Sequence, residues 1–299
     1  MIFIILIGLF LFGAVLASFA VAQVWRIRAR QLKHEMESGE EVDKTEWKKL
    51  KSLARVKQRD DRSKCLHCEY TLRSYDLIPV VSWLSLGGKC RKCRKPIGAT
   101  EFVAEIALGA LFVASFLMWP LVNLAGAEAS ALQIVSFILW LILLVILTIL
   151  FIYDMKWSLL PLNLMLAFIA LSAVFWIINT TSVVGFGVEL IANLLISMAI
   201  LPGIYWILDT VSRGTWVGSG DWIISIGLVL MIPNSPILTA FVLFLSNFLG
   251  TLFIVTSSMI KKESLGRGAR IPFGPFLIIA TILIFFTYPY IMNFLSFSV

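Results

Sequence analysis

The chain has 299 residues, of which 59% are hydrophobic and 14% are charged, and its mean hydropathy is +0.91. A soluble globular domain carries about 25% charged residues, so the composition excludes an ordinary soluble protein and predicts an all-α polytopic membrane protein. The net charge of +7 is not evidence for a nucleic-acid partner, because 19 of the 25 Lys and Arg residues lie between Arg26 and Lys95. Basic residues gathered in this way are typical of loops retained in the cytoplasm.

Residues 1–24 form an apolar run that ends just before a cluster of arginines beginning at Arg26. A cleaved signal peptide carries its positive charge before the apolar run, so we expect a first spanning helix with its N-terminus outside the cytoplasm. The polar segment after it, residues 31–64, is expected to be a solvated linker in which residues 34–56 could form a surface helix.

The four cysteines of the chain form two Cys-x2-Cys pairs, Cys65 with Cys68 and Cys90 with Cys93. They lie in the basic segment, and disulfides are disfavoured in the cytoplasm. Four thiolates in two such pairs suit a tetrahedral structural zinc ion. Free thiols or a redox pair are the alternative. We interpret His67 as a spacer, because the four thiolates already complete the site.

Seven further apolar segments follow, at residues 102–124, 131–153, 159–179, 183–208, 222–232, 237–259 and 275–296. A spanning helix needs roughly 20 mostly apolar residues, and these segments give about eight transmembrane helices in all. With eight spans, every Lys and Arg lies on the cytoplasmic side, as the positive-inside rule favours. The outer loops, which contain no Lys or Arg, are expected at residues 125–130, 180–182 and 233–236.

This topology predicts three parts: a first transmembrane helix (1–24), a cytoplasmic zinc-binding domain (25–100) and a seven-helix membrane domain (101–299). The last cytoplasmic loop is expected at residues 261–270. We expect Glu101 and Glu105, at the inner end of the second span, to mark the membrane interface rather than to take part in chemistry.

Two aspartates fall at the cytoplasmic membrane face in this topology: Asp154 ends the third span, and Asp221 begins the sixth behind Gly218 and Gly220. A lone carboxylate in hydrocarbon is costly, so such residues usually face a cavity or a partner. Of two carboxyl groups sharing a site, one can draw a proton from water while the other donates to a scissile carbonyl. The glycines would let the backbone approach an extended substrate.

Other interpretations of these carboxylates are open from the residues alone. Each aspartate could be an interface residue, and Asp221 could be a helix N-cap. Asp209 is a competing partner on the same face, and Glu189 is a poorer one because it lies nearer the outer end of its span.

Several stretches together resemble the bacterial prepilin peptidase family, the type 4 prepilin leader peptidases with a GxGD active site. In chain order these stretches are Ser18-Phe19 with Arg26, residues 65–105 around the cysteines, Asp154 with Leu160-Pro161, the stretch of Gly218, Ser219, Gly220 and Asp221, and the stretch of Pro272, Phe273, Gly274, Pro275, Phe276 and Leu277. The cysteine segment is the most specific of them. The chain departs from the family pattern at Ala17, Val21 and Leu66, where Gly, Asn and Pro are usual.

The resemblance implies an intramembrane aspartic endopeptidase with Asp154 and Asp221 as its catalytic residues. Its substrates would be type IV prepilin-like precursors, whose basic leader is cleaved at the cytoplasmic face of the bacterial inner membrane, among membrane lipids. It also implies structural zinc on the four cysteines and N-methylation of the new terminus with S-adenosylmethionine, although no Gly-x-Gly-x-Gly loop identifies the methyl-donor site. The alternatives are a peptidase without methyl transfer and a proton-coupled polytopic transporter.

Overall fold

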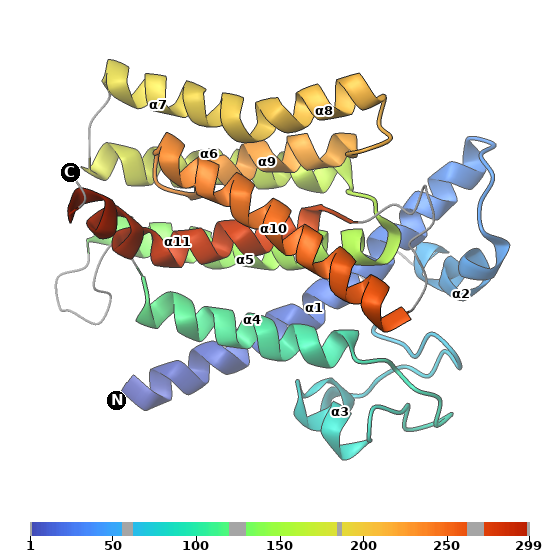
Figure 1. Ribbon diagram of the computed structural model, residues 1–299. Coiled ribbons are helices and arrows are strands. Elements are labelled where there is room, and N and C mark those ends of the chain that lie inside the picture. Colours follow the sequence, from blue (N-terminus) through green and yellow to red (C-terminus); the bar gives the residue numbers. More distant parts are fainter. Residues whose placement is uncertain (1, 56–61, 120–129, 184–186, 262–271, 298–299) are drawn as a thin grey trace. The chain divides into compact units, whose positions relative to one another are not determined.

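The computed structural model describes residues 2–55, 62–119, 130–183, 187–261 and 272–297 (Figure 1), and all regular elements of these residues are helical. The chain divides into two compact units, Met1–Ala114 and Ser115–Val299. We describe each by itself. The three functional parts expected from the sequence have other boundaries and stay a prediction.

The first unit is built on a long N-terminal helix and a set of short elements. They are α1 (Ile2–Glu37), α2 (Lys44–Arg55), the 3-10 turn η1 (Ser74–Leu77), α3 (Val81–Ser85) and α4 (Thr100–Leu117), whose last turn passes into the second unit.

The helix α1 continues well past the expected end at residue 24. Between residue 24 and Gly39 the sequence contains no Gly or Pro, and Gly39, which has a φ of +84°, follows the helix end. The surface helix expected over residues 34–56 is therefore wrong as a single element. Its first residues belong to α1, and its later part forms α2.

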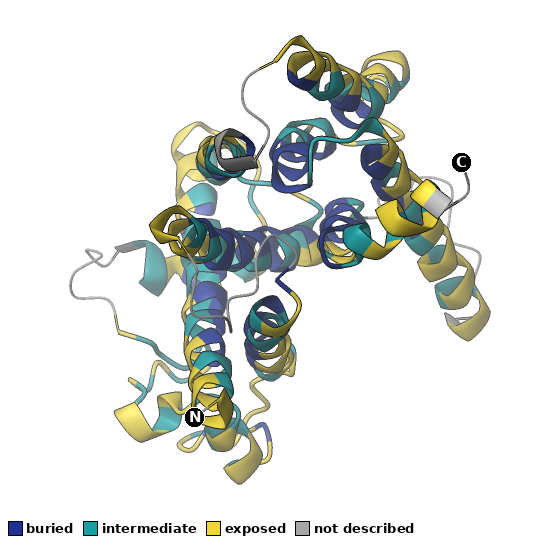
Figure 2. Cartoon of the chain, turned by 90° about the vertical axis from the view of Figure 1, so that its left-hand side faces the viewer, coloured by how far each residue is buried: buried dark blue, intermediate teal, exposed yellow. Residues whose placement is uncertain are grey.

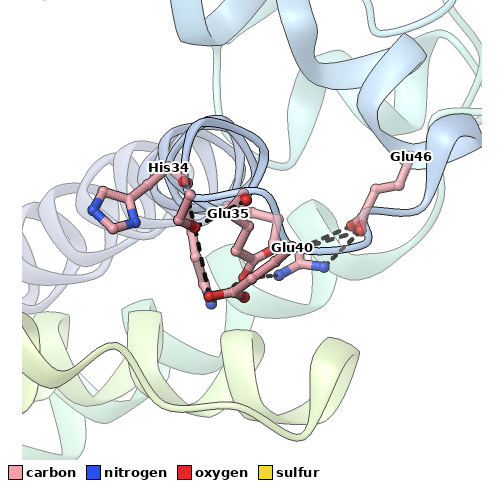
Figure 3. Close-up of polar contacts among 7 residues, drawn as sticks. His34, Glu35, Glu40 and Glu46 are labelled. Atoms are coloured by element: carbon pink, nitrogen blue, oxygen red, sulfur yellow. Dashed lines mark hydrogen bonds and ion pairs between the residues drawn. The ribbon is translucent and has the colours of Figure 1, made fainter.

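The charged end of α1 packs against α2. Ala29 and Leu32 form a small core with Leu50. The same two helices are joined by an ion pair, in which Arg28 Nη2 donates a 2.8 Å hydrogen bond to Glu46 Oε2. Figure 3 shows this contact among others around the end of α1. Both charged side chains are less than a fifth exposed, so this ion pair is better shielded than an ordinary surface pair.

The apolar halves of α1 and α4 approach closely at two glycines. A Cβ atom on Gly13 would lie 2.9 Å from the carbonyl oxygen of Leu108, and one on Gly109 would lie 2.9 Å from that of Phe10. In a membrane the hydrophobic effect does not drive helices together, because the lipid is as apolar as the side chains. Small residues at a helix crossing instead let the two backbones come into close van der Waals contact. Any larger residue at either glycine would push the helices apart.

The second unit is a bundle of helices. They are α5 (Ala131–Trp157), α6 (Leu162–Val183), α7 (Val188–Met198), the π-helical turn η2 (Ala199–Gly203), α8 (Ile204–Ser212), α9 (Ser219–Met231), α10 (Pro236–Lys261) and α11 (Gly274–Phe297). The helix α6 packs against α5 and α9, and α11 packs against α5, α9 and α10. Buried residues concentrate on α5, α9 and the first half of α11 (Figure 2).

An aromatic cluster fills the centre of this bundle. Trp140 of α5 is fully buried, stacks on Phe285 of α11 at a centroid distance of 3.8 Å, and donates from Nε1 to Ser115 Oγ at 2.9 Å. The edge of Trp119 meets Trp140 at 5.9 Å. Such contacts supply dispersion and aromatic packing, which hold helices together in an apolar solvent.

Among the described residues, seven helices are long and apolar enough to cross a membrane, and α9, with 13 residues, is shorter. Together they account for the expected count of about eight, including the short sixth span. One of the seven, Val188–Ser212, is made of α7, η2 and α8 in sequence, with Pro202 in the π-helical turn.

Of three expected loops, one is wrong and two lie almost wholly outside the described residues. The outer turn expected at residues 180–182 is wrong, because α6 continues to Val183. Nearly all of the expected loops at 125–130 and 261–270 lies outside the described residues.

Candidate active site and metal centre

Two chain turns with the same backbone pattern carry the four cysteines. In each turn the first cysteine, Cys65 or Cys90, donates its N–H at 2.9 Å to the carbonyl five residues later. Its own carbonyl accepts from the N–H four residues later, at 2.9 Å and 3.0 Å respectively. The residue directly after the second cysteine has a φ of +55° in one turn and +59° in the other. Two unrelated sequences thus form the same knuckle.

The knuckles bring all four sulfur atoms together. The Sγ atoms of Cys65 and Cys93 are 3.9 Å apart, as are those of Cys68 and Cys90, and all four lie within 4.8 Å of one another. Four thiolates at the usual Zn–S length of about 2.3 Å lie about 3.8 Å from each other in a tetrahedron. The cluster therefore fits a metal ion and is compatible with zinc.

The thiols of the cluster differ in acidity. Burial raises the pKa of Cys65 to about 12. Burial acts in the same direction on Cys90, but backbone N–H groups of Cys93 and Lys92 outweigh it and lower the pKa of Cys90 to about 7. A thiolate, the form that binds metal, is therefore accessible at Cys90 near neutral pH.

Glu105 anchors the cysteine segment to the helices of the first unit. It is 6% exposed, accepts the N–H of Val80 at Oε2 at 2.7 Å, and interacts with the Ser18 hydroxyl of α1. Val80 has a φ of +63°, a strained conformation for a β-branched residue that its surroundings must hold. Glu105 is therefore a buried structural link between the cysteine segment and α1, and its expected place at the membrane interface stays a prediction.

Asp154 lies in the last turn of α5 and is 4% exposed. Its Oδ2 accepts the backbone N–H of Gly274, at the start of α11, at 3.0 Å. A Cβ atom on Gly274 would lie 2.7 Å from the same oxygen, so only glycine lets the backbone come this close. This contact accounts for the glycine in the Pro-Phe-Gly-Pro stretch.

Asp221 lies in the first turn of α9 and is 7% exposed. Its Oδ2 accepts the N–H of Gly218 at 3.2 Å, in the manner of a capping-box carboxylate. The backbone of the same turn is fixed by the Ser225 hydroxyl, which donates to the Asp221 carbonyl at 2.6 Å. Asp221 is not itself the N-cap residue, which is Gly218.

One leucine side chain joins the surroundings of the two aspartates. Leu160, between α5 and α6, lies so close to Gly220 that a Cβ there would be 2.9 Å from its Cδ1. The same Cδ1 is 3.7 Å from the Cβ position of Gly274. Asp154 and Asp221 also lie within electrostatic range of each other. The structure therefore brings the two expected carboxylates to one end of the second unit.

The other carboxylates considered from the sequence are placed differently. Asp209, in the last full turn of α8, is half-buried and lies within electrostatic range of Asp221. Glu189, in the first turn of α7, is exposed and lies at the other end of this unit.

Sequence reasoning missed Tyr205, whose hydroxyl lies in the same neighbourhood. Tyr205 of α8 is 1% exposed, accepts a 3.2 Å hydrogen bond from Asn247 Nδ2, and interacts with Ser246 and electrostatically with Asp221. Its ring is 5.5 Å from that of Phe273. A tyrosine in an apolar segment is usually an interface or packing residue, and the signal in the sequence was Pro202-Gly203 just before it. The structure has the π-helical turn η2 at this point, and such turns often mark functional sites.

These features define a multi-pass helical membrane protein with a four-cysteine centre and a pair of buried carboxylates. Comparison with known proteins makes the class more specific. Residues 11–119 match the family described as "Bacterial Peptidase A24 N-terminal domain". This segment contains most of α1, both knuckles and α4.

Curated relatives agree with the family match. The chain is 50% identical over 50 residues to a "Prepilin leader peptidase/N-methyltransferase" of Burkholderia pseudomallei (strain K96243), covering 17% of this chain and 16% of the relative. It is 31% identical over 108 residues to the "Type 4 prepilin-like proteins leader peptide-processing enzyme" of Escherichia coli O78:H11, covering 36% and 38%. It is also 32% identical over 114 residues to the Pectobacterium carotovorum "Prepilin leader peptidase/N-methyltransferase", covering 38% and 36%.

These matches confirm the resemblance to bacterial prepilin peptidases. The aligned segments span less than two fifths of the length of each of these relatives, and the family match ends before either aspartate. No solved structure matches the chain.

Proposed function

We propose that the protein is an intramembrane aspartic endopeptidase that removes the basic leader from type IV prepilin-like precursors. The observation that carries the proposal is the pair of buried carboxylates, Asp154 and Asp221, from two helices at one end of the second unit. The relatives' names supply the substrate class, because they describe prepilin leader processing.

The mechanism needs one carboxyl group to take a proton from water and the other to donate one to the scissile carbonyl. Two carboxyl groups that share a proton can divide these tasks. The N–H groups of Gly274 and Gly218 each hold one oxygen of an aspartate, which leaves the second oxygen to face water or substrate. Neither carboxylate is paired with a Lys or Arg among the described residues, so proton exchange is not blocked by a fixed cation.

Substrate orientation follows from charge. We propose that the aspartate end of the second unit and the cysteine segment lie on the cytoplasmic side, with the N-terminus outside, because a basic leader stays on that side. Cleavage would then occur where the leader meets the apolar helix of the precursor. Zinc would be held by the four cysteines and would be structural, since four thiolates leave no open position.

Methyl transfer with S-adenosylmethionine is part of the same proposal, on the strength of the relatives' names. A cavity of about 190 Å³ in the first unit is lined by Trp25, Arg62, Lys64 and Glu101, among others. An aromatic ring, two cations and a carboxylate are the side-chain types that would bind the donor's adenine, carboxylate and ammonium groups, and a cavity of this size would hold one part of the donor. The donor would supply the methyl group. Equilibrium binding of labelled donor to wild type and to Lys64→Ala tests this cavity, and unchanged binding by the variant would point to another site.

The decisive experiment is cleavage of a prepilin-like precursor by the purified protein in detergent. Asp154→Asn and Asp221→Asn should each abolish cleavage while leaving the melting temperature nearly unchanged. Asp209→Asn is the matched control at the same end of the bundle and should keep most of the activity. If Asp209→Asn loses cleavage while Asp154→Asn keeps it, the carboxylates have been paired wrongly. Absence of cleavage by wild type on several precursors would favour the transporter alternative.

A further inference from the structure

The segment between the two knuckles carries exposed apolar side chains. Val81 and Leu84 of α3 are each 58% exposed, and Ile78, just before this helix, is 47% exposed. Val81 and Leu84 are three positions apart in a helix, so they lie on one side of it. We call this pair the α3 face. Apolar side chains that lie together at a surface mark a place that a partner or a membrane covers.

Contacts with the start of α4 hold α3 in place. The Trp83 ring stacks on Phe102 at a centroid distance of 4.5 Å, and its Nε1 donates to the Gly98 carbonyl at 2.7 Å. Glu105, in the second turn of α4, accepts the Val80 N–H at 2.7 Å. In Figure 1, α3 accordingly lies beside the first turns of α4 and not beyond the end of that helix.

The two apolar helices that meet at Glu105 indicate its depth in the membrane. The 18 residues of α4 rise about 27 Å at 1.5 Å per residue, which is no more than the hydrocarbon thickness of about 30 Å. The first turns of α4 therefore lie close to the edge of that layer. On α1, Glu105 interacts with Ser18, which lies about 12 Å along the helix before Arg26, the first arginine of the chain. Both helices place Val80 and α3 at the boundary between hydrocarbon and headgroups.

The backbone of this segment is suited to a place with little water. The first N–H groups of a helix have no partner within it, and backbone groups that face lipid have to be satisfied by the protein. Glu105 accepts the N–H of Val80, and the N–H groups of Ser82 and Leu84 donate to carbonyls four residues earlier at 3.0 Å and 3.1 Å. With these backbone groups bonded, the side chains of the α3 face can meet lipid.

Exposed basic side chains follow α3 directly in the chain. The Gly88 N–H donates to the Trp83 carbonyl at 2.9 Å and so joins the second knuckle to α3. Between Gly88 and Thr100 the sequence has no Asp or Glu. Anionic lipids attract basic clusters of this kind that lie beside a membrane. The exposed basic side chains of this knuckle are Lys89, Arg91, Lys92, Arg94 and Lys95.

We propose that the α3 face is an interfacial anchor of the cysteine segment. Val81 and Leu84 enter the boundary between headgroups and acyl chains, and the basic side chains of the second knuckle bind anionic headgroups beside it. The anchor fixes the height of the cysteine segment against the membrane. The choice of the cytoplasmic leaflet rests on the orientation proposed above, whereas the insertion itself does not depend on the cleavage reaction.

Photo-crosslinking of the full chain in lipid nanodiscs tests the insertion. Benzoylphenylalanine is placed at one exposed position at a time: at Leu84, at Val103 on α4 as the lipid-facing reference, and at Lys51 on α2 as the matched control. Irradiation should give lipid adducts at Leu84 with a yield close to that at Val103, and none at Lys51. A yield at Leu84 as low as that at Lys51 would overturn the proposal.

Two further outcomes of the crosslinking are informative. Adducts from Leu84 to a second copy of the chain or to a precursor, in place of lipid, would overturn the proposal and assign the α3 face to a protein partner. The variant Asp154→Asn should give the same lipid adducts as wild type, because the anchor does not take part in cleavage. Failure of the anchor and failure of the proposed cleavage are therefore distinguishable.

Hydrogen exchange supplies a second measurement that needs no crosslinker. In nanodiscs the amides of residues 77–88 should exchange several-fold faster in Leu84→Glu than in wild type, because a carboxylate withdraws the α3 face from the acyl chains. Lys51→Glu is the control and should leave these amides unchanged. Equal exchange in Leu84→Glu and wild type would contradict the insertion.

The role of the basic side chains is tested by the lipid headgroup. Amides of the second knuckle should exchange more slowly in nanodiscs that contain phosphatidylglycerol than in nanodiscs of phosphatidylcholine alone. The double variant Lys92→Glu, Lys95→Glu should abolish this difference. Equal exchange of wild type in the two lipids would refute the binding of anionic headgroups. Inorganic phosphate added to phosphatidylcholine nanodiscs should have no effect, and slower exchange with phosphate would show that the knuckle binds a free anion rather than a membrane.

Discussion

The substitution Gly274→Ala tests whether the backbone of α11 holds Asp154. The added Cβ would lie 2.7 Å from the Asp154 Oδ2 atom, inside the 3.0 Å limit that Cβ contacts respect. Gly274 does not have a positive φ, so alanine can adopt its backbone conformation and the effect is steric. The carboxyl group has to move by at least 0.3 Å, the difference between 3.0 and 2.7, and by about 1 Å to reach ordinary contact.

The expected loss follows from that displacement. A hydrogen bond to a charged group contributes about 1.5–3 kcal/mol, and a misplacement of about 1 Å in a catalytic group can cost about 100-fold in rate. Each 1.36 kcal/mol is a factor of about ten. We therefore expect the cleavage rate constant of Gly274→Ala to fall about 10- to 100-fold, with KM changed much less.

The assay measures kcat and KM for a prepilin-like precursor, with the melting temperature of each variant as a check on folding. Gly220→Ala should lose less, because its Cβ meets the flexible Leu160 side chain at 2.9 Å rather than a carboxylate. Gly8→Ala, where the new Cβ meets nothing within 4 Å, should behave like wild type. Full activity of Gly274→Ala, or equal losses in all three variants, would refute the steric argument.

Further predictions concern the tyrosine, the metal and pH. Tyr205→Phe should lower kcat about 10-fold, roughly the value of one hydrogen bond near a charged group, without changing KM; an unchanged kcat would make Tyr205 a packing residue. Wild type should contain one zinc per chain by elemental analysis, and a chelator or Cys68→Ser should lower the melting temperature of the first unit; a stable, metal-free protein would contradict this. Asp76→Asn should destabilise the first unit at pH 7, because the Arg91 guanidinium, against the opposing effect of burial, holds the pKa of Asp76 below its ordinary value. Such a carboxylate stabilises the fold above its unfolded pKa of about 3.9. The difference in unfolding free energy between wild type and Asp76→Asn should therefore shrink as the pH falls below about 4. A free-energy difference that does not change with pH would exclude the ion pair as the cause of the destabilisation.

The sequence was most informative where spacing and charge constrain structure directly. Two Cys-x2-Cys pairs predicted one cluster, and the structure gathers their sulfur atoms within 4.8 Å. The apolar segments predicted the helices of the bundle, including the short one after Gly220. Asp154 and Asp221 could be placed at the same end because each lies at the end of an apolar run, and the count of runs between them fixes the direction of the chain.

Other features depend on packing that no local pattern carries. Helix α1 runs to Glu37 because its charged end finds a partner in α2, where Arg28 and Glu46 pair. A hydropathy boundary at residue 24 could not show that. The contact between Gly274 and Asp154 joins residues 120 positions apart, and the strained backbone at Val80 is held by Glu105, 25 positions away.

The choice of partners for the two aspartates has a chemical consequence. A Lys or Arg beside either carboxyl group would favour its ionised form and oppose the sharing of a proton. Backbone N–H groups orient a carboxyl oxygen without adding a net charge, but the N–H nitrogen must come within about 3 Å of that oxygen. At position 274 any residue larger than glycine would prevent this approach. The glycine at position 274 therefore follows from the need to orient the Asp154 carboxyl group without a cation. On this reasoning, introducing a lysine in contact with Asp154 would be more harmful to cleavage than removing the Gly274 contact, although it would satisfy the buried charge better.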